Sequence, residues 1–587
     1  MQRHNSTAGR LGAWPIIRAY WVSPDSGPGW RLLAAVIALD LALVWRAARI
    51  TYWQKDFYDT LQKMDEAAFW PLLAMLVLLA LTGLVLSTAR TWLAQSLEMR
   101  WRAWMTDVYL KRWLAGSAFW RLEREQHPAG CSVENVDQRL AEDLRMLASD
   151  TLSLSLGLLS NFVSLFTFSA IVWSMSGVLS ITLGGASFEV PGYMLWVALI
   201  YAAGGSWLME KIGGRMVAID YRQQQAEADF RTALMRIRES AEQIALYGGG
   251  HAEHARLTAL FDAVKHNWRD IMVYTKRITI TDNAYTEAGA LVPYVLQGPR
   301  VLKGIITMGD LIQLTQSFMR VRVALSWFIY KYKSLALLRS TLARLAEFDA
   351  ALQAASGATA SVPRITRQRG PAASGYALQG VQALGPGGRP LTPVVNWRIA
   401  PGERWMLRGP SGAGKSTLLR ALAGLWTHGH GHIATPPETA ETPETATPPG
   451  AAAAPRAEIL FVPQQSYLPI DTLRACLAYP ALETAFSDDD CQAALRWACL
   501  PALTHRLHES AHWARQLSPG EQQRLAFARI WLHRPRWLFL DEATSALDEE
   551  TEERLYTRLT RDLPGLTLVS IAHRSSLRRF HEHEMQL

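Results

Sequence analysis

The first half of the chain alternates long apolar stretches with long charged ones. Residues 67–89 and 151–188 contain no charged side chain, and neither do residues 190–209, a stretch of 20 residues. A helix of about 20 residues crosses the hydrocarbon core of a bilayer, so 151–188 has residues left over for an extension outside it. Three weaker stretches are interrupted by charged side chains. Together the pattern predicts six membrane-spanning helices: 32–45, 67–89, 151–188, 190–209, 280–299 and 309–330.

Basic residues predict which ends of the spans lie in the cytoplasm. Residues 90–150 hold nine Lys and Arg side chains and residues 210–277 hold eleven, whereas residues 176–190 hold none. Because Lys and Arg concentrate in cytoplasmic loops, we expect both long charged segments, the N-terminus and the second half of the chain in the cytoplasm. An even number of spans agrees with this topology. The loop 50–68 is expected outside.

The two charged segments have the apolar spacing of helices. In the first, apolar side chains recur every three or four residues: Leu93, Leu97, Trp101, Trp104 and Val108. Residues 234–244 of the second segment are similar. We therefore expect the spans to continue as helices into the cytoplasm and to turn at a tip that touches the second half of the chain. Helices lying flat on the membrane surface are the alternative.

The second half of the chain has short apolar runs typical of buried parallel strands, such as residues 537–540, which end at Asp541. Residues 409–416 read GPSGAGKS. This fits the phosphate-binding pattern G-x-x-x-x-G-K-[ST], whose glycines let consecutive backbone N–H groups surround phosphates. Lys415 is then expected to reach the β- and γ-phosphates, and the Ser416 hydroxyl to ligate Mg²⁺. Alone, the pattern indicates only a nucleotide-binding protein.

Further motifs follow in a fixed order: Phe461-Val-Pro-Gln464, Leu517-Ser-Pro-Gly-Glu-Gln-Gln-Arg524, Leu538-Phe-Leu-Asp541-Glu542, Ser545-Ala-Leu-Asp548 and His573. In this order they resemble the ATP-binding cassette family. The resemblance implies ATP and Mg²⁺ as cofactors and ATP hydrolysis as the reaction. The residues expected to bind ATP are Gly409, Pro410, Ser411, Gly412, Ala413, Gly414, Lys415, Ser416, Thr417 and Asp541.

The resemblance also assigns roles in catalysis. Glu542 is expected to be the base for the attacking water, His573 a γ-phosphate contact, and Gln464 a contact to the metal or water that senses the membrane domain. The expected ligands of Mg²⁺ are Ser416, Gln464 and Asp541. In this family the signature segment reads the γ-phosphate of ATP held by the other subunit, so two chains are needed for turnover. Here that segment contains Ser518, Gly520 and Glu521.

Three positions depart from the family pattern. Pro519 stands where glycine is usual, which removes one backbone N–H that could face phosphate. Glu521 stands where glutamine is common. No aromatic residue lies near residues 384–386, where the family usually stacks one on adenine, and Tyr376 fits a strand better. We expect a retuned nucleotide site that is still active, and leave the adenine contact open.

Similarity to one branch of the family extends into the first half of the chain. Residues 135–143 (NVDQRLAED) and 242–249 (EQIALYGG) resemble motifs of the branch that contains bacterial peptide-antibiotic and cobalamin uptake transporters and peroxisomal fatty-acyl transporters. Residues 53–58 fit as well. The resemblance implies a half-transporter of the exporter-type fold, with an α-helical six-span membrane domain followed by an α/β P-loop nucleotide-binding domain.

This reading divides the chain into four parts. We expect a cytoplasmic N-terminal segment (1–29), a transmembrane domain with two long cytoplasmic helical loops (30–350), a linker (351–375) and an ATP-binding cassette (376–587). Residues 435–456 are rich in Pro, Thr, Glu and Ala and cannot contribute to a packed core, so we expect a disordered insertion there.

Composition supports a membrane protein. Of 587 residues, 49% are hydrophobic and only 19% charged, and the 23 Trp fit interfacial anchors. The four cysteines fall in expected cytoplasmic segments and should be free thiols. We attribute the net charge of +8 to loops near anionic lipid and expect no nucleic-acid partner. Residues 1–29 lack the apolar core of a cleavable signal. Because of the predicted spans and the resemblance to bacterial transporters, we expect a multi-pass protein of a bacterial inner membrane.

The leading hypothesis is an ATP-driven transporter that works as a homodimer and moves a hydrophilic or amphipathic solute, such as a peptide or a cobalamin-like molecule. Two alternatives are a membrane-tethered ATPase or regulator that transports nothing, and one half of a heterodimeric lipid or acyl exporter. The direction of transport is open. A second hypothesis concerns Asp40, an acid in the middle of the first span, which we expect to pair with Arg320 or Arg322 or to titrate.

Overall fold

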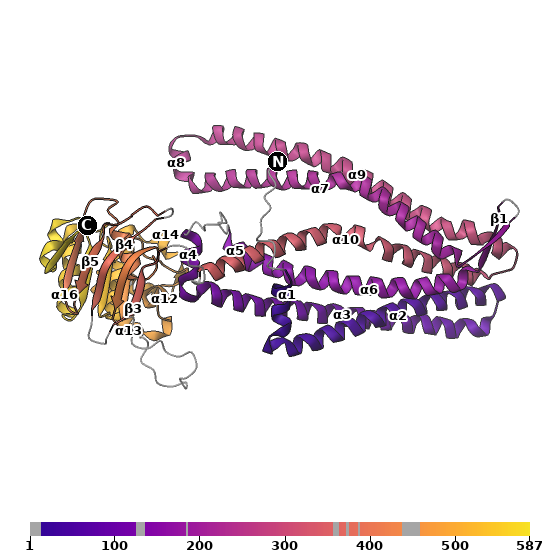
Figure 1. The fold of residues 1–587 in the computed structure, drawn as a ribbon, viewed down its shortest axis with the longest axis horizontal. Coiled ribbons are helices and arrows are strands. Elements are labelled where there is room, and N and C mark those ends of the chain that lie inside the picture. Colours follow the sequence, from indigo (N-terminus) through magenta and orange to yellow (C-terminus); the bar gives the residue numbers. More distant parts are fainter. Residues whose placement is uncertain are drawn as a thin grey trace. The chain divides into compact units, whose positions relative to one another are not determined.

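The computed structural model describes residues 13–124, 135–183, 186–355, 363–370, 375–385, 388–436 and 458–587. The chain divides into two compact units, each described here by itself (Figure 1). The first comprises Met1–Trp113 and Val133–Ala351, and the second comprises Leu114–Ser132 and Leu352–Leu587. The expected fold class is confirmed, since the first unit is almost entirely helical and the second is α/β. The expected insertion, from residue 437 onward, and Cys131 lie outside the described residues.

Long helices dominate the described part of the first unit. Those with more than thirty residues are α2 (Gly27–Lys63), α3 (Glu66–Leu114), α6 (Leu144–Ser176), α7 (Tyr193–Glu239), α9 (Gly250–Leu302) and α10 (Met308–Ala355). At 1.5 Å per residue a helix of this kind is roughly 50–80 Å long, which exceeds the roughly 30 Å of a hydrocarbon core. In α3, α7 and α9 the apolar stretches and the charged stretches form single continuous helices.

Shorter elements connect these helices. α1 (Ala13–Val22) precedes α2, and α5 (Val136–Gln138) leads through a π-helical turn (Arg139–Asp143) into α6. The antiparallel hairpin β1 (Val178–Leu183) and β2 (Ala186–Pro191) joins α6 to α7. α8 (Ala241–Leu246) lies at the tip between α7 and α9.

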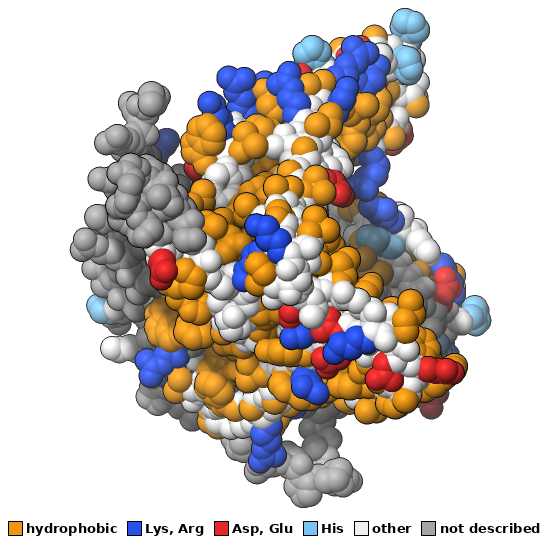
Figure 2. All heavy atoms as spheres, turned by 90° about the vertical axis from the view of Figure 1, so that its right-hand side faces the viewer, with side chains coloured by type: hydrophobic (Ala, Val, Ile, Leu, Met, Phe, Trp, Pro, Cys, Tyr) orange, Lys and Arg blue, Asp and Glu red, His pale blue; other side chains and the backbone are white. Residues whose placement is uncertain are grey.

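Apolar side chains cover much of the outside of the first unit. On α3, Leu78, Leu81 and Val85 are each more than half exposed. Figure 2 looks onto the end of this unit that carries the β1–β2 hairpin, where hydrophobic side chains also occupy much of the surface. Within the described residues, two helical stretches are long and apolar enough to cross a membrane, Glu66–Glu123 and Val136–Ser176. The count of six spans stays a prediction.

The interior of the first unit joins helices that are distant in the sequence. One buried cluster contains Phe168 and Val172 of α6, Met194 of α7 and Phe318 of α10, all inaccessible to solvent. α10 is buried around about half of its circumference, because Gln313, Leu314, Phe318 and Thr315, which point in successive directions around the helix, are at most 6% exposed. This helix is therefore central to the unit.

Asp40 corrects one of our expectations. Its carboxylate accepts a hydrogen bond from Nε of Arg90 on α3 at 3.0 Å, so the proposed partners Arg320 and Arg322 were wrong. α2 and α3 form an antiparallel hairpin around a short turn. Lys63, the end of α2, lies 23 residues after Asp40, and Arg90 lies 24 residues after Glu66, the start of α3. The two side chains are thus at the same level of the hairpin.

The second unit contains two larger sheets. The five-stranded parallel sheet has the order β13 (His583–Gln586), β6 (Arg404–Arg408), β12 (Thr567–Ile571), β11 (Trp537–Asp541) and β8 (Ile459–Val462). The four-stranded sheet has the order β3 (Thr366–Arg369), β7 (Gly429–Thr435), β4 (Tyr376–Ala383) and β5 (Val395–Ile399). Tyr376 is 1% exposed in the core between them, where its ring contacts Trp537 and Phe539, so it is not available to stack on a base.

Helices complete the second unit. α11 (Lys415–Leu422) and α16 (Glu549–Asp562) accompany the parallel sheet, and the two-residue strands β9 (Asp471–Thr472) and β10 (Ser510–Ala511) pair with each other. A separate apolar cluster around the fully buried Trp513 joins α12 (Leu473–Ala478), α13 (Asp488–Trp497), α14 (Trp513–Gln516) and α15 (Pro519–His533). α4 (Ala118–Arg124) also belongs to this unit, although it comes from the first half of the chain.

Candidate functional site: a nucleotide site at the ends of parallel strands

The predicted site residues follow directly after neighbouring parallel strands. Gly409 follows β6, Glu542 follows β11, and Gln464 and His573 each come two residues after the ends of β8 and β12. The carboxyl ends of parallel strands lie at one edge of a sheet, where ligands of α/β domains commonly bind. Motifs that are far apart in the sequence are thus brought together at one edge of the parallel sheet.

The phosphate loop has the backbone that its glycines allow. Gly412 and Gly414 have φ of 83° and 88°, in the left-handed region that favours glycine. A Cβ at Gly414 would also lie 2.3 Å from the carbonyl oxygen of Leu391. Lys415 is 6% exposed, and its Nζ donates to the carbonyl oxygens of Gly409 at 2.7 Å and Pro410 at 2.9 Å. The ammonium group is therefore held inside the loop, where phosphates would bind.

Two predicted metal ligands are in contact. The Ser416 hydroxyl, in the first turn of α11, donates to Oδ1 of Asp541 at 2.9 Å. Burial raises the pKa of Asp541, and the hydrogen bond from Ser416 opposes that shift. A hydroxyl beside a carboxylate is a pair of hard oxygen donors, which suits a cation such as Mg²⁺. Within the described residues, no group of three or more His, Cys, Asp or Glu side chains forms another metal site.

Glu542 is held between two polar side chains. Its backbone is left-handed, with φ of 50°, a conformation that side chains other than glycine rarely adopt and that often marks functional sites. Nε2 of Gln464 donates to one carboxylate oxygen at 3.0 Å, and Nε2 of His573 lies 3.0 Å from the other. The structure thus unites the three residues predicted for catalysis.

The signature residues form a second group, at the start of α15. Ser518 is the N-cap of this helix and makes a reciprocal capping box with Glu521. Pro519 occupies the first helical position, where a missing backbone N–H costs nothing. A Cβ at Gly520 would come within 3.2 Å of the carbonyl oxygen of Ala546. The capping box and the proline fix where α15 begins, with Ser518 exposed at its end.

Sequence reasoning did not single out Trp120. This residue of α4 lines a pocket together with Ser416, Gln464 and Asp541, and its ring lies 6.3 Å from that of Trp426. The expectation that a helical tip touches the second half of the chain named the segment but no residue. An apolar aromatic in a short charged stretch (FWRLER, residues 119–124) was the available signal.

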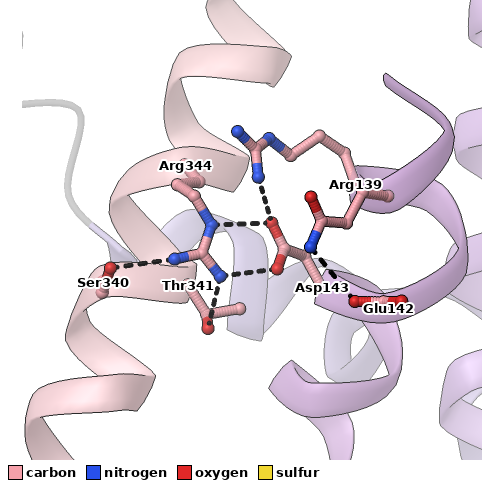
Figure 3. A network of polar contacts seen from close by, with 7 residues as sticks. Arg139, Glu142, Asp143, Ser340, Thr341 and Arg344 are labelled. Atoms are coloured by element: carbon pink, nitrogen blue, oxygen red, sulfur yellow. Dashed lines mark hydrogen bonds and ion pairs between the residues drawn. The ribbon is translucent and has the colours of Figure 1, made fainter. Parts of the chain in front are cut away.

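A polar network holds the motif at residues 135–143 (Figure 3). Asp143, 1% exposed, ends the π-helical turn and binds two guanidinium groups. Arg344 of α10 donates to both of its oxygens, at 2.6 Å and 2.9 Å, and Arg139 donates at 3.0 Å. Arg344 is oriented in turn by the hydroxyls of Ser340 and Thr341. The motif thus ties the start of α6 to the C-terminal half of α10.

Comparisons with known proteins agree with this geometry. The family described as "ABC transporter transmembrane region 2" matches residues 16–302, and the family described as "ABC transporter" matches residues 393–545. The chain is 31% identical over 564 residues to "Inner membrane ABC transporter ATP-binding protein YddA" of Escherichia coli K12, covering 95% of this chain and 94% of that protein.

More distant relatives extend the similarity to other organisms. "ABC transporter D family member 2, chloroplastic" of Arabidopsis thaliana is 29% identical, covering 98% of this chain and 85% of its own. Human "Lysosomal cobalamin transporter ABCD4" is 26% identical, covering 95% and 92%. A bacterial Atm1-family ABC exporter with ATP bound shares the fold, with a TM-score of 0.65 at 17% identity over 95% of this chain and 93% of that one.

Proposed function

Since the chain belongs to the ABC transporter family, and is thus a membrane protein that couples ATP hydrolysis to transport, we propose that it is a half-transporter working as a dimer of two identical chains. The observation that carries the proposal is the set of contacts around the Glu542 side chain. Its carboxylate already contacts Gln464 and His573, next to the Ser416–Asp541 pair and the phosphate loop. A membrane-tethered regulator would have no need for an intact hydrolytic site.

In the proposed mechanism, Glu542 accepts a proton from the water that attacks the γ-phosphate. A general base must lie within hydrogen-bond reach of that water, and Gln464 and His573 hold both carboxylate oxygens in place. Lys415 leaves its carbonyl partners to bind the β- and γ-phosphates. Ser416, Asp541 and Gln464 would hold Mg²⁺, which neutralises phosphate charge when bound.

The second copy completes the site in this proposal. Ser518 is exposed at the start of α15, and Gln464 and His573 are exposed at the other group of site residues. Each signature segment would read the γ-phosphate of ATP bound by the other chain, so ATP would join the two cassettes. Closure and reopening of the cassettes would then switch the access of the membrane helices.

We propose a hydrophilic or amphipathic solute, such as a peptide or a cobalamin-like molecule. Buried polar side chains on α9 and α10 support this, because Gln297, Gln313 and Ser317 are each at most 1% exposed and polar groups inside membrane helices often mark solute pathways. The human relative is a cobalamin transporter, which favours the same class of solute. The Escherichia coli relative is an inner-membrane protein, which favours a bacterial inner membrane. The cassette and the N-terminus would be cytoplasmic.

The proposal is tested with the full chain purified alone and reconstituted in liposomes. We expect ATP hydrolysis that requires Mg²⁺ and no second gene product. Absence of activity in the single purified chain, with activity restored by a co-expressed homologue, would establish a heterodimer instead. Uptake of candidate solutes into inverted and right-side-out vesicles then gives the direction of transport.

A further inference from the structure

Arg322 is a buried cation in the expected membrane region of α10. The residue is 6% exposed, and among the described residues its hydrogen bond is a long one, from Nη1 to the Thr286 hydroxyl at 3.3 Å. Nε has no hydrogen-bond partner among the described residues. Among the residues that the structure describes, no carboxylate forms an ion pair with Arg322, in contrast to Arg90, which binds Asp40. Guanidinium stays protonated in proteins, so the charge cannot be lost by titration.

A pair of stacked tyrosines lies beside the Arg322 guanidinium group. The guanidinium carbon of Arg322 lies 5.0 Å from the ring centroid of Tyr285. The ring of Tyr201 stacks on the ring of Tyr285, with 4.7 Å between their centroids and an interplanar angle of 10°. Tyr201 also donates its hydroxyl to the carbonyl oxygen of Tyr285 at 2.5 Å. The Tyr285 hydroxyl itself is buried and has no partner among the described residues. Two unpartnered donors, Arg322 Nε and the Tyr285 hydroxyl, are thus buried in one cluster.

Two glycines make room for the cluster. A Cβ at Gly205 on α7 would lie 2.1 Å from the ring of Tyr285, and a Cβ at Gly289 on α9 would lie 3.0 Å from Tyr201 and 3.3 Å from Cδ of Arg322. Side chains at either position would displace the tyrosines or the arginine. Helices α7, α9 and α10 therefore accommodate this cluster. Without a further partner, it leaves the Arg322 charge desolvated and the Tyr285 hydroxyl without a hydrogen bond.

We propose that Arg322 and Tyr285 form a binding subsite for an oxyanion, a carboxylate or phosphate carried by an amphipathic molecule. Arg recognises both groups through its planar fork of donors, and the stacked tyrosines offer an apolar surface to the remainder of the molecule. A buried charge is costly unless it is paired, and charged side chains inside membrane segments commonly mark solute pathways. The subsite deepens the proposed function, on which it rests for its link to transport: the solute would be an anion.

Arg320 provides a matched control on the same helix. It lies two positions away, is exposed, and its guanidinium carbon is 6.0 Å from the Phe168 ring. Both arginines have the same charge and similar sequence surroundings. The subsite involves only Arg322, so Arg320→Gln should leave anion binding intact.

The test measures binding without ATP, by isothermal titration of octanoate and of octyl phosphate, with octanol as the neutral control, into the full chain in phosphatidylcholine nanodiscs. We expect the two anions to bind at least tenfold more tightly than octanol, Arg322→Gln to abolish that preference and Arg320→Gln to keep it. Tyr285→Phe should weaken anion binding about threefold or more, since it removes one donor.

Further arms separate the sources of the anion and cover a failure to fold. If the soluble anions do not bind, native mass spectrometry of protein extracted from phosphatidylglycerol nanodiscs should show retained lipid that Arg322→Gln releases, which assigns the site to a lipid phosphate. Should Arg322→Gln not fold, Arg322→Lys keeps the charge but not the planar fork, and must weaken binding. Equal binding in wild type and the Arg322 variants, with no retained lipid, overturns the subsite, whereas absent ATP hydrolysis with intact binding would overturn only the proposed function.

Discussion

The hydroxyl of Ser518 donates a hydrogen bond to the carboxylate of Glu521 at 2.7 Å, and the same carboxylate oxygen accepts the backbone N–H of Ser518 at 2.8 Å. These hydrogen bonds lower the pKa of Glu521, so the carboxylate is ionised at neutral pH. If Ser518 reads the γ-phosphate of ATP on the partner chain, its hydroxyl proton must leave Glu521. The carboxylate then competes with the phosphate for one donor and repels it.

Glu521→Gln should therefore strengthen the nucleotide-bound dimer. Glutamine can keep the capping box, and the negative charge near phosphate is removed. Relief of a repulsion of about 1 kcal/mol would lower the ATP concentration at half-maximal hydrolysis by about fivefold. Glu521→Ala is the control, because it also removes the charge but breaks the cap. Half-saturation that is unchanged or raised in the glutamine variant would contradict the competition.

Glu542→Gln should bind ATP and lose turnover. The amide keeps a similar size and can still contact Gln464 and His573, but it cannot accept the proton of the attacking water. Hydrolysis should fall by about 10²–10⁴-fold, the usual contribution of a general base. Steady-state phosphate release measures the rate, and Glu549→Gln, an exposed acid at the start of α16, serves as the control. A loss of less than about tenfold speaks against the role of base.

Asp40→Asn should destabilise the membrane unit more than the double change Asp40→Asn with Arg90→Gln. Breaking one side of a buried ion pair leaves an uncompensated charge, which costs about 3–5 kcal/mol, whereas removing both sides can be nearly neutral. Thermal unfolding of the detergent-solubilised chain compares the variants. A double variant no more stable than Asp40→Asn alone would show that Arg90 does not depend on this carboxylate.

Asp143→Asn should uncouple α6 from α10. The change leaves Arg139 and Arg344 without their shared carboxylate. Asp143 is almost fully buried but the two arginines are partly exposed, so we expect a loss below the roughly 3–5 kcal/mol of a fully buried pair. Glu142→Gln is the matched control, since the neighbouring carboxylate accepts only from Gln138 among the described contacts. Unfolding temperature and ATP hydrolysis should fall together in the first variant and not in the second. If the two variants have the same unfolding temperature and the same rate of ATP hydrolysis, the Asp143 network does not stabilise the contact between α6 and α10.

Much of the nucleotide site could be predicted because it depends on short motifs at strand ends. The run Trp537–Leu540 predicted a buried strand, and Asp541 at its end was expected beside the phosphate loop, where it contacts Ser416. For Asp541 the local sequence pattern is enough to predict where the residue lies in the fold. The expectation that Glu542 and Gln464 act at the same site came from the resemblance to the family, and the two side chains are in contact. The relation between Ser518 and Glu521 could also have been read from the capping-box spacing.

The membrane unit was harder to predict because its contacts depend on helix register. The partner of Asp40 was sought on a distant helix, although the α2–α3 hairpin places Arg90 at its level. The π-helical turn at residues 139–143 shifts which side chains face α10, and no sequence rule predicts it. Trp120 was missed because its aromatic partner, Trp426, lies 306 residues further along the chain.

The assignment of residues 114–132 to the second unit has a practical consequence for protein engineering. A cassette expressed from residue 352 onward would lack α4, and with it the wall that Trp120 contributes to the pocket beside Ser416 and Gln464. Leu419 and Leu425, which line the same pocket, and Trp426, which contacts Trp120, would then lose this cover, and exposed apolar surface of this kind promotes aggregation. A soluble version of this cassette is better designed with the α4 segment fused back through a linker than by a single cut.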